Sequence, residues 1–140
     1  MASKYFAIDF DRDSQAAFAI FNGQKKHTDA AIRKIQEYIE KNVQEKISVV
    51  ELAGMAALGR RSFERRFKHA TGHAVLEYIH RVKVEAAKRS FENSRKNISE
   101  VMQEIGYNDT KAFRIIFKKT TGLTPAEYRN KYNKHAPAGI

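Results

Sequence analysis

The sequence of 140 residues contains no cysteine, which excludes disulfide bonds, thiolate zinc sites and cysteine nucleophiles. No apolar run approaches the roughly 18 residues that a membrane-spanning helix requires. The N-terminus also lacks the charged stretch and the apolar stretch that together form a secretory signal. We therefore expect a soluble, cytoplasmic protein with one domain, or with one compact unit and a tail.

The residue sets that carry most enzymatic and metal chemistry are also missing. We find no Ser-His-Asp set, glycine-rich phosphate loop or inward-facing carboxylate pair. Residues 9–13 resemble the start of a calcium-binding loop, but Ser14 and Ile20 stand where that loop needs Gly and Glu. His69 and His73 have the spacing of zinc ligands, yet a glycine between them should break the helix. The sequence predicts no enzyme, no metal site and no cofactor.

Positive charge is what the sequence has in excess. Its 26 Lys and Arg residues outnumber 16 Asp and Glu residues, which gives a formal net charge of +10. Nine Phe and six Tyr, within a hydrophobic content of 42%, can build a core. A basic folded protein favours a polyanionic partner, with nucleic acid as the first candidate and an anionic membrane surface as the second.

One segment of the chain occurs twice. Residues 59–72 read GRRSFERRFKHATG, and residues 108–122 read NDTKAFRIIFKKTTG. Alignment on the final glycine matches two Phe, one Lys and the Thr-Gly pair, and the match extends to Tyr78 and Tyr128. Each copy places its two Phe four residues apart on one helical face and leaves a basic face opposite. Two such helices indicate paired readers of nucleic acid.

Apolar spacing and capping signals predict an all-α chain. Capping boxes are expected at residues 48–51 and 124–127, the second with proline in its first turn. The first helix would begin at Thr28 or Asp29, and the fifth at Asn97 or Ser99. The seven expected helices cover about residues 28–42, 48–57, 60–70, 73–93, 97–105, 110–120 and 124–132.

The two copies repeat with a period of 49 residues before the turn and 50 after it. This repeat indicates a duplicated helix-turn-helix, at about residues 48–70 and 97–120. The long helix between them should turn one apolar face inward, with Leu76, Ile79, Val82, Ala86 and Phe91. On the first outer helix, Arg66 is expected to pack its stem near the Phe side and to keep its head in solvent.

Three motifs together resemble a known family. They are F-x3-F-K-x2-T-G in both copies, G-Y-x-D-x3-F from residue 106 and L-T-P-x2-Y-R from residue 123. Across about residues 29–132 the chain is similar to the AraC/XylS family of bacterial transcription regulators. The resemblance implies a seven-helix DNA-binding domain, in which a rigid helix joins two helix-turn-helix subdomains. Each subdomain would insert its second helix into the major groove.

The resemblance also implies which side chains meet DNA bases: Arg61, Glu64, Arg65, Thr110, Lys111, Arg114 and Ile115. Helical geometry gives an overlapping set, because most of these positions lie opposite the phenylalanines. Phosphate contacts are expected from basic side chains and from helix N-termini, namely Arg60, Lys68, Lys118, Ser48 and Thr124.

Two positions depart from the family pattern. Gly59 replaces the usual Ser at the start of the first reading helix and is a weaker cap. Ile115 replaces a common Arg, whose counterpart in the first copy is Arg65. Isoleucine cannot donate a hydrogen bond, so base reading in the second copy would shift to Lys111 and Arg114, or Ile115 would touch a thymine methyl group.

Residues 1–27 differ from the rest of the chain. Residues 6–10 alternate as a weak strand, residues 17–21 fit a strand or a helix, and Asn22-Gly23 marks a turn. We interpret this segment as a tail, or as the remnant of a preceding domain or linker, and residues 28–140 as the DNA-binding domain. A looser resemblance around residues 21–29 implies a glutamine-amidotransferase-like sensor domain before it.

The predicted function is sequence-specific binding of double-stranded DNA for transcription regulation. The alternative is a helical module that binds polyanions nonspecifically or docks to a protein. RNA polymerase is a candidate protein partner, and no membrane partner is expected. We expect this chain to be monomeric and the full-length regulator to dimerise through its sensor domain.

Overall fold

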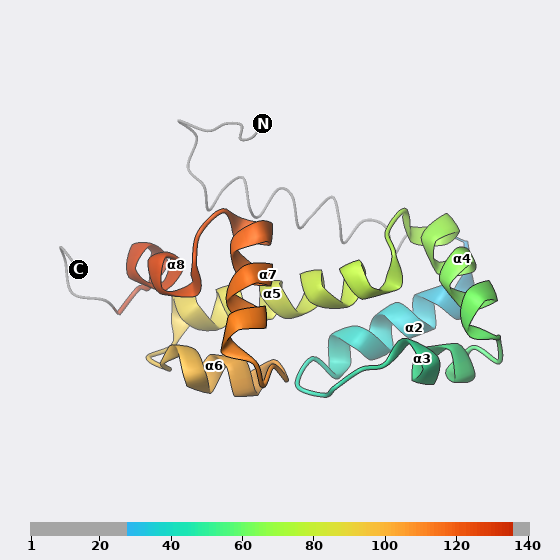
Figure 1. Ribbon diagram of the computed structural model, residues 1–140, viewed down its shortest axis with the longest axis horizontal. Helices are drawn as coiled ribbons and strands as arrows, with labels where there is room; N and C mark the ends of the chain where they lie inside the picture. Colours follow the sequence, from blue (N-terminus) through green and yellow to red (C-terminus); the bar gives the residue numbers. More distant parts are fainter. Residues whose placement is uncertain (1–27, 136–140) are drawn as a thin grey trace.

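The computed structural model describes residues 28–135, which form seven α-helices and no strand within that range (Figure 1). The all-α prediction is confirmed for these residues, whereas the features predicted within residues 1–27 lie outside them. In chain order the helices are α2 (Ala30–Lys41), α3 (Val49–Met55), α4 (Arg60–Thr71), α5 (Val75–Asn93), α6 (Ile98–Glu104), α7 (Thr110–Thr121) and α8 (Pro125–Tyr132).

Side-chain caps determine where several helices begin. Of the alternatives that the sequence left open, Asp29 caps α2 and Asn97 forms a full capping box at the start of α6. The box predicted at the start of α8 is also present. Thr124 accepts a hydrogen bond from the Glu127 N–H, and the Glu127 carboxylate accepts one from the Thr124 N–H. These local bonds satisfy amides that a helix N-terminus leaves unpaired.

Helix α3 is shorter than predicted. The capping box expected at residues 48–51 is half formed. The Ser48 hydroxyl accepts from the Glu51 N–H, but within the described residues the Glu51 carboxylate does not accept from the Ser48 N–H. The helix ends at Met55 instead of near Ala57. Ala57 takes the left-handed conformation, with φ 57°, which interrupts α-helical geometry and starts the turn into α4.

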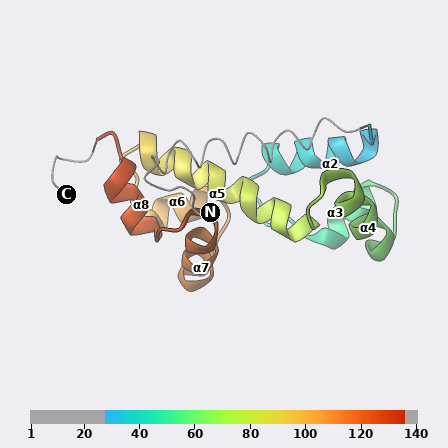
Figure 2. The same cartoon turned by 90° about the horizontal axis from the view of Figure 1, so that it is seen from above.

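Two hydrophobic cores lie along the two halves of α5. Figures 1 and 2 show α2, α3 and α4 around one end of this helix and α6, α7 and α8 around the other. Residues of α5 up to Val82 pack into the first core, and residues from Val84 onward pack into the second. We call the first group, with the first half of α5, unit one, and the second group, with the second half of α5, unit two.

The inward face of α5 differs in part from the prediction. Leu76 was expected in the core but is 54% exposed, and Ala86 is half-buried, whereas the other predicted residues are buried. Val75 and Tyr78 fill the core at the beginning of the helix instead. The prediction for Leu76 failed because α5 serves two cores, so its buried surface is not one continuous stripe.

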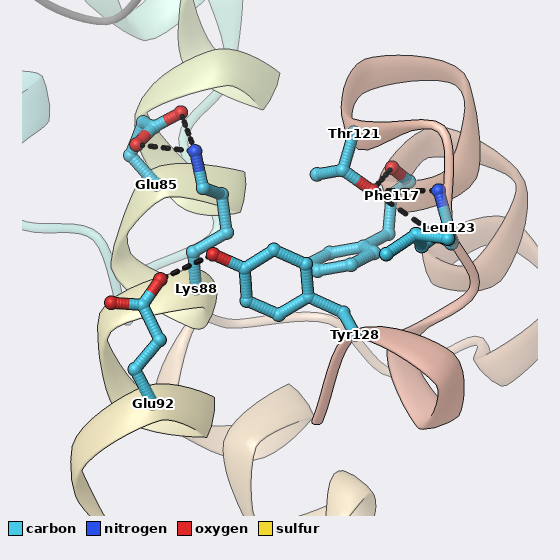
Figure 3. A network of polar contacts seen from close by, with 7 residues as sticks. All are labelled: Glu85, Lys88, Glu92, Phe117, Thr121, Leu123 and Tyr128. Atoms are coloured by element: carbon cyan, nitrogen blue, oxygen red, sulfur yellow. Dashed lines mark hydrogen bonds and ion pairs between the residues drawn. The ribbon is translucent and has the colours of Figure 1, made fainter. Parts of the chain in front are cut away.

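The structural duplication extends beyond the helix-turn-helix. Three buried residues of α2 have counterparts at identical spacing in the second half of α5; the sets are Ile32, Ile35 and Ile39, and Val84, Ala87 and Phe91. The Tyr78 hydroxyl donates to Glu40 of α2 at 3.1 Å. The Tyr128 hydroxyl makes the equivalent bond to Glu92 of α5 (Figure 3). Helix α5 is therefore both the last helix of unit one and the first helix of unit two.

Candidate nucleic-acid interface

Helix α4 separates a buried aromatic edge from a charged outer face. Phe63 and Phe67 have no exposed surface, and their ring centroids lie 5.9 Å apart. The helix begins at Gly59 without a side-chain cap, as expected. The opposite face exposes the side chains that the sequence assigned to DNA, namely Arg60, Arg61, Glu64, Arg65 and Lys68. Within this face Arg60 lies 3.7 Å from Glu64, an exposed ion pair that leaves both groups accessible.

Helix α7 repeats this arrangement with different chemistry. Phe113 and Phe117 are fully buried, with ring centroids 5.6 Å apart. The exposed face carries the predicted contact residues Thr110, Lys111, Arg114, Ile115 and Lys118. Ile115 is 57% exposed, so an apolar side chain lies in solvent where α4 presents Arg65. Asp109 caps the helix by accepting from the N–H groups of Lys111 and Ala112 at 2.9 and 3.3 Å.

A Thr-Gly pair closes each of these helices in the same way. The Thr121 hydroxyl lies 2.9 Å from the Phe117 carbonyl oxygen and accepts from the Leu123 N–H at 3.1 Å (Figure 3). Thr71 repeats both contacts in unit one, at 2.9 and 3.1 Å. The glycines that follow take left-handed φ angles of 80° and 86°. This closure sets the angle between each basic helix and the helix after it.

A hollow lies beside each basic helix, at the start of the next helix. The hollow in unit one, of about 400 Å³, is lined by Arg65 and Lys68 of α4 and by residues 74–76. The hollow in unit two, of about 300 Å³, is lined by Thr110 and Arg114 of α7 and by residues 124–126. Leu76 thus lines a surface hollow rather than the core. The two hollows give both basic helices a concave, partly cationic flank.

Electrostatic interactions connect the start of α8 with the basic face of α7. The pKa of Glu127 lies below its ordinary value, mainly because the carboxylate accepts a hydrogen bond from the Thr124 backbone N–H. The Thr124 hydroxyl contributes further, and the positive charges of Lys118 and Arg114 add smaller effects. Glu127 therefore remains ionised in its cap and lies near the cationic face of α7.

The two basic helices share one side of the molecule. Figure 1 shows α4 and α7 running in the same sense on either side of the middle of α5. In the turned view of Figure 2 both lie toward the edge opposite α2. An extended polyanion on that side can therefore meet both basic faces. A polyanion with grooves wide enough for a helix, such as duplex DNA, fits this arrangement.

Sequence reasoning missed two features next to this face. The head of Arg66 does not remain free in solvent but pairs with Asp29, with Nε 2.8 Å from a carboxylate oxygen. Lys83 in the middle of α5 is buried, although lysine is usually exposed. Its helical neighbours Ile79 and Ala87, four residues away on either side, are buried, and this spacing was the available signal.

The described part of the chain shows neither a metal site nor a membrane span. Within residues 28–135, no three His, Cys, Asp or Glu side chains gather closely enough to hold a metal ion. No helix in the same range combines the length and the apolar character needed to cross a bilayer.

Comparison with known proteins assigns the family. A family model described as a helix-turn-helix domain matches residues 52–131, which include α4, α5, α6 and α7. The DNA-binding domain of AdpA, solved in complex with a target DNA, superposes with a TM-score of 0.71 at 31% identity. That match covers 77% of this chain and 97% of the AdpA chain. The chain belongs to the AraC/XylS family.

Curated AraC/XylS relatives agree with this assignment. The bifunctional transcriptional activator/DNA repair enzyme AdaA of Bacillus subtilis is 37% identical over 95 residues, covering 68% of this chain and 45% of the relative. The xylose operon regulatory protein of Escherichia coli is 31% identical over 103 residues, covering 74% of this chain and 26% of the relative. The chain therefore spans less than half the length of these relatives. As an AraC-type helix-turn-helix domain, it binds DNA for transcription regulation.

Proposed function

We propose that this chain reads two adjacent major-groove segments of duplex DNA, one with α4 and one with α7, about 10 bp apart. The observation that carries the proposal is the repeated basic face. In both units the same helical positions are exposed opposite two fully buried phenylalanines, and both helices lie on one side of α5. Because the two basic faces repeat at equivalent helical positions, they favour a partner whose structure also repeats, such as the groove of DNA.

The two helices would read DNA differently. Arg61 and Arg65 of α4 can each grip guanine O6 and N7, and Glu64 can accept from cytosine N4. On α7, Arg114 and Lys111 are the charged readers, Thr110 stands at the first position, and Ile115 can contact a thymine methyl group. A good bidentate pair discriminates by roughly 1–3 kcal/mol, so unit one would contribute more sequence preference than unit two.

The backbone contacts would position the protein without reading sequence. Lys68 and Lys118 occupy equivalent exposed positions at the ends of the two basic faces. Arg60, Ser48 and Thr124 stand at the first turn or N-cap of their helices, where free amides also favour phosphate. We propose that the chain acts by binding and not by catalysis. Contact with RNA polymerase, and dimerisation of a longer regulator through a sensor domain, remain predictions from the family resemblance.

Selection of duplexes from a random library at ~150 mM salt tests the proposal, because this ionic strength suppresses nonspecific phosphate binding. Two enriched blocks about 10 bp apart would support reading by both units. One enriched block would mean that unit two grips mainly the backbone. Binding without enrichment would refute sequence reading by this chain and favour a nonspecific polyanion-binding module.

A further inference from the structure

The boundary between the two cores falls on a single buried lysine. Val82 belongs to the core of unit one and Val84 to the core of unit two, and Lys83 lies between them with 5% of its surface exposed. A charged group at this depth needs compensating contacts, because burial without them is strongly unfavourable. The contacts of Lys83 therefore show what holds the two units together.

The Lys83 ammonium group donates to carbonyl oxygens of both units. Two acceptors, Val43 and Glu45, lie in the segment between α2 and α3 of unit one, the second at 2.9 Å. The third acceptor is the Ile105 carbonyl, 2.8 Å away, which ends α6 in unit two. An ammonium group has three N–H donors, so these contacts use all of its hydrogen-bonding capacity.

Two further contacts close the same junction. Gly106 has φ +78°, and a Cβ added there would lie 2.7 Å from the Gln44 carbonyl oxygen, so the turn of unit two touches the loop of unit one. The Tyr107 hydroxyl lies 2.6 Å from Nδ1 of His80 on α5, with the two rings stacked. A lysine, a glycine and a tyrosine–histidine pair thus join the second helix-turn-helix to the first unit.

We propose that Lys83 is a positioning residue, which fixes the angle between α4 and α7 and thereby the spacing between DNA blocks that this chain accepts. The part concerning DNA rests on the proposed function. Duplex DNA turns by about 34° per base pair, so a change of two base pairs in the spacer rotates one block by about 70° relative to the other. A junction held by three directed hydrogen bonds cannot follow that rotation, whereas a bare helix with loosely docked units can.

The first experiment measures the junction without DNA. Because the chain has no cysteine, Ser62→Cys on α4 and Lys119→Cys on α7 place two spin labels at exposed positions outside the predicted base contacts. The label-to-label distance distribution should be narrow in the protein with native Lys83. Lys83→Met keeps an unbranched side chain only one atom shorter but removes all three donors, and it should widen or shift this distribution.

The chain offers a matched control in a second buried lysine. Lys88 lies on the same helix with 3% exposure, but its ammonium group donates to a carboxylate oxygen of Glu85, at 2.9 Å, on α5 itself (Figure 3). The double variant Glu85→Gln/Lys88→Met removes a buried ion pair within unit two and should leave the distance distribution narrow. Lys83→Gln shortens the side chain and removes the ammonium group, so it should also widen the distribution, which keeps the test open if Lys83→Met does not fold.

The second experiment measures the consequence on DNA. With the selected two-block site, the native protein should lose at least ~10-fold in affinity when the spacer changes by two base pairs, the equivalent of about one lost base contact. The affinity of Lys83→Met should fall less than ~3-fold for the same spacer change, and its affinity for one block alone should be unchanged. A narrow, unshifted distance distribution in Lys83→Met or in Lys83→Gln would overturn the inference. A widened distribution without any two-block selection would support the junction and refute two-block reading.

Discussion

Arg66 of α4 donates two hydrogen bonds to Asp29, the N-cap of α2, from Nε at 2.8 Å and from a terminal guanidinium nitrogen at 3.0 Å. Asp29 also caps α2 by accepting from the Ile32 N–H at 3.2 Å. One carboxylate therefore begins the first described helix and attaches it to the first basic helix. The pair raises the pKa of Arg66 above its ordinary value, through the hydrogen bond and the charge of Asp29.

The two roles of Asp29 can be separated by substitution. Asp29→Ala removes the cap and the ion pair, and it should lower the free energy of unfolding by about 1 kcal/mol through the cap alone. Asp29→Asn keeps a good cap but removes the charge, so it should be less destabilising than Asp29→Ala. Urea denaturation measures the free energy of unfolding of both variants. Equal destabilisation by the two substitutions would mean that the ion pair, and not the cap, is the important contact.

Helix α5 of unit one lacks the side-chain cap that α8 of unit two has, and one substitution should add it. Thr124 caps α8 with φ −69° and ψ 161°, and the equivalent Ala74 before α5 has φ −64° and ψ 148° without a side-chain cap. Glu77 already stands at the third helical position, as Glu127 does in α8. Ala74→Thr should therefore raise the free energy of unfolding by about 0.5–1 kcal/mol, and Thr124→Ala should lower it by about 1 kcal/mol.

The control for this change is Ala74→Val, which has the shape of threonine without its hydroxyl group. Urea unfolding of the three proteins compares them directly. If Ala74→Thr is no more stable than Ala74→Val, a capping bond does not form at this position.

Stability should rise between pH 8 and pH 10 because of Lys83. Burial lowers the pKa of Lys83 to about 8, partly offset by Glu45, whereas an exposed lysine has its ordinary value of 10.5. Between these values the unfolded chain binds more protons than the folded one, so the free energy of unfolding increases with pH, by about 2 kcal/mol from pH 8 to pH 10. Lys83→Met should remove this rise. Parallel pH profiles for the two proteins would contradict the assignment.

Above pH 10 the free energy of unfolding should fall as the pH rises. Burial raises the pKa of Tyr107 to about 12, so its hydroxyl keeps its proton in the folded protein after unfolded tyrosine has lost it at about 10. The contribution of Tyr107 to stability is complete below pH 10 and disappears as the pH rises through 12. Tyr107→Phe should reduce this loss of stability at high pH. Urea unfolding across pH 9–12 measures the difference.

Two basic side chains of α4, one predicted to read bases and one to contact phosphate, should differ in the effect of their removal. Arg65→Ala should relax sequence preference in the first DNA block by roughly 1–3 kcal/mol at the base it reads. Lys68→Ala should weaken all sequences evenly and reduce the slope of log affinity against log salt by about 1. Competition binding against single-base variants of the selected site distinguishes the two outcomes.

Unit two allows the converse change. Ile115→Arg restores a hydrogen-bonding side chain at the position equivalent to Arg65 and should create a new preference for guanine in the second block. Ile115→Ala is the control for loss of the apolar contact. If Ile115→Arg tightens binding to every sequence equally, the added charge meets phosphate and α7 does not present this position to bases.

The outline of the fold could be predicted because its signals are local. The paired phenylalanines, the Thr-Gly closures, the helix start near Asn97 and the capping box at Thr124 act within about one helical turn, and each has its signal in the sequence. The exposed positions of the two basic helices followed from the same periodicity. The actual contacts of these positions with DNA remain predictions.

The sequence by itself determined a basic, duplicated helix-turn-helix with seven helices, since helical period, caps and repeats need no distant partner. Only the tertiary structure decided that Leu76 faces a hollow, that Arg66 pairs with Asp29 and that Lys83 is buried between two cores. Each of these outcomes depends on which element packs against the residue from far along the chain. A side chain at a fixed helical position is buried or exposed according to that partner, and local spacing does not specify it.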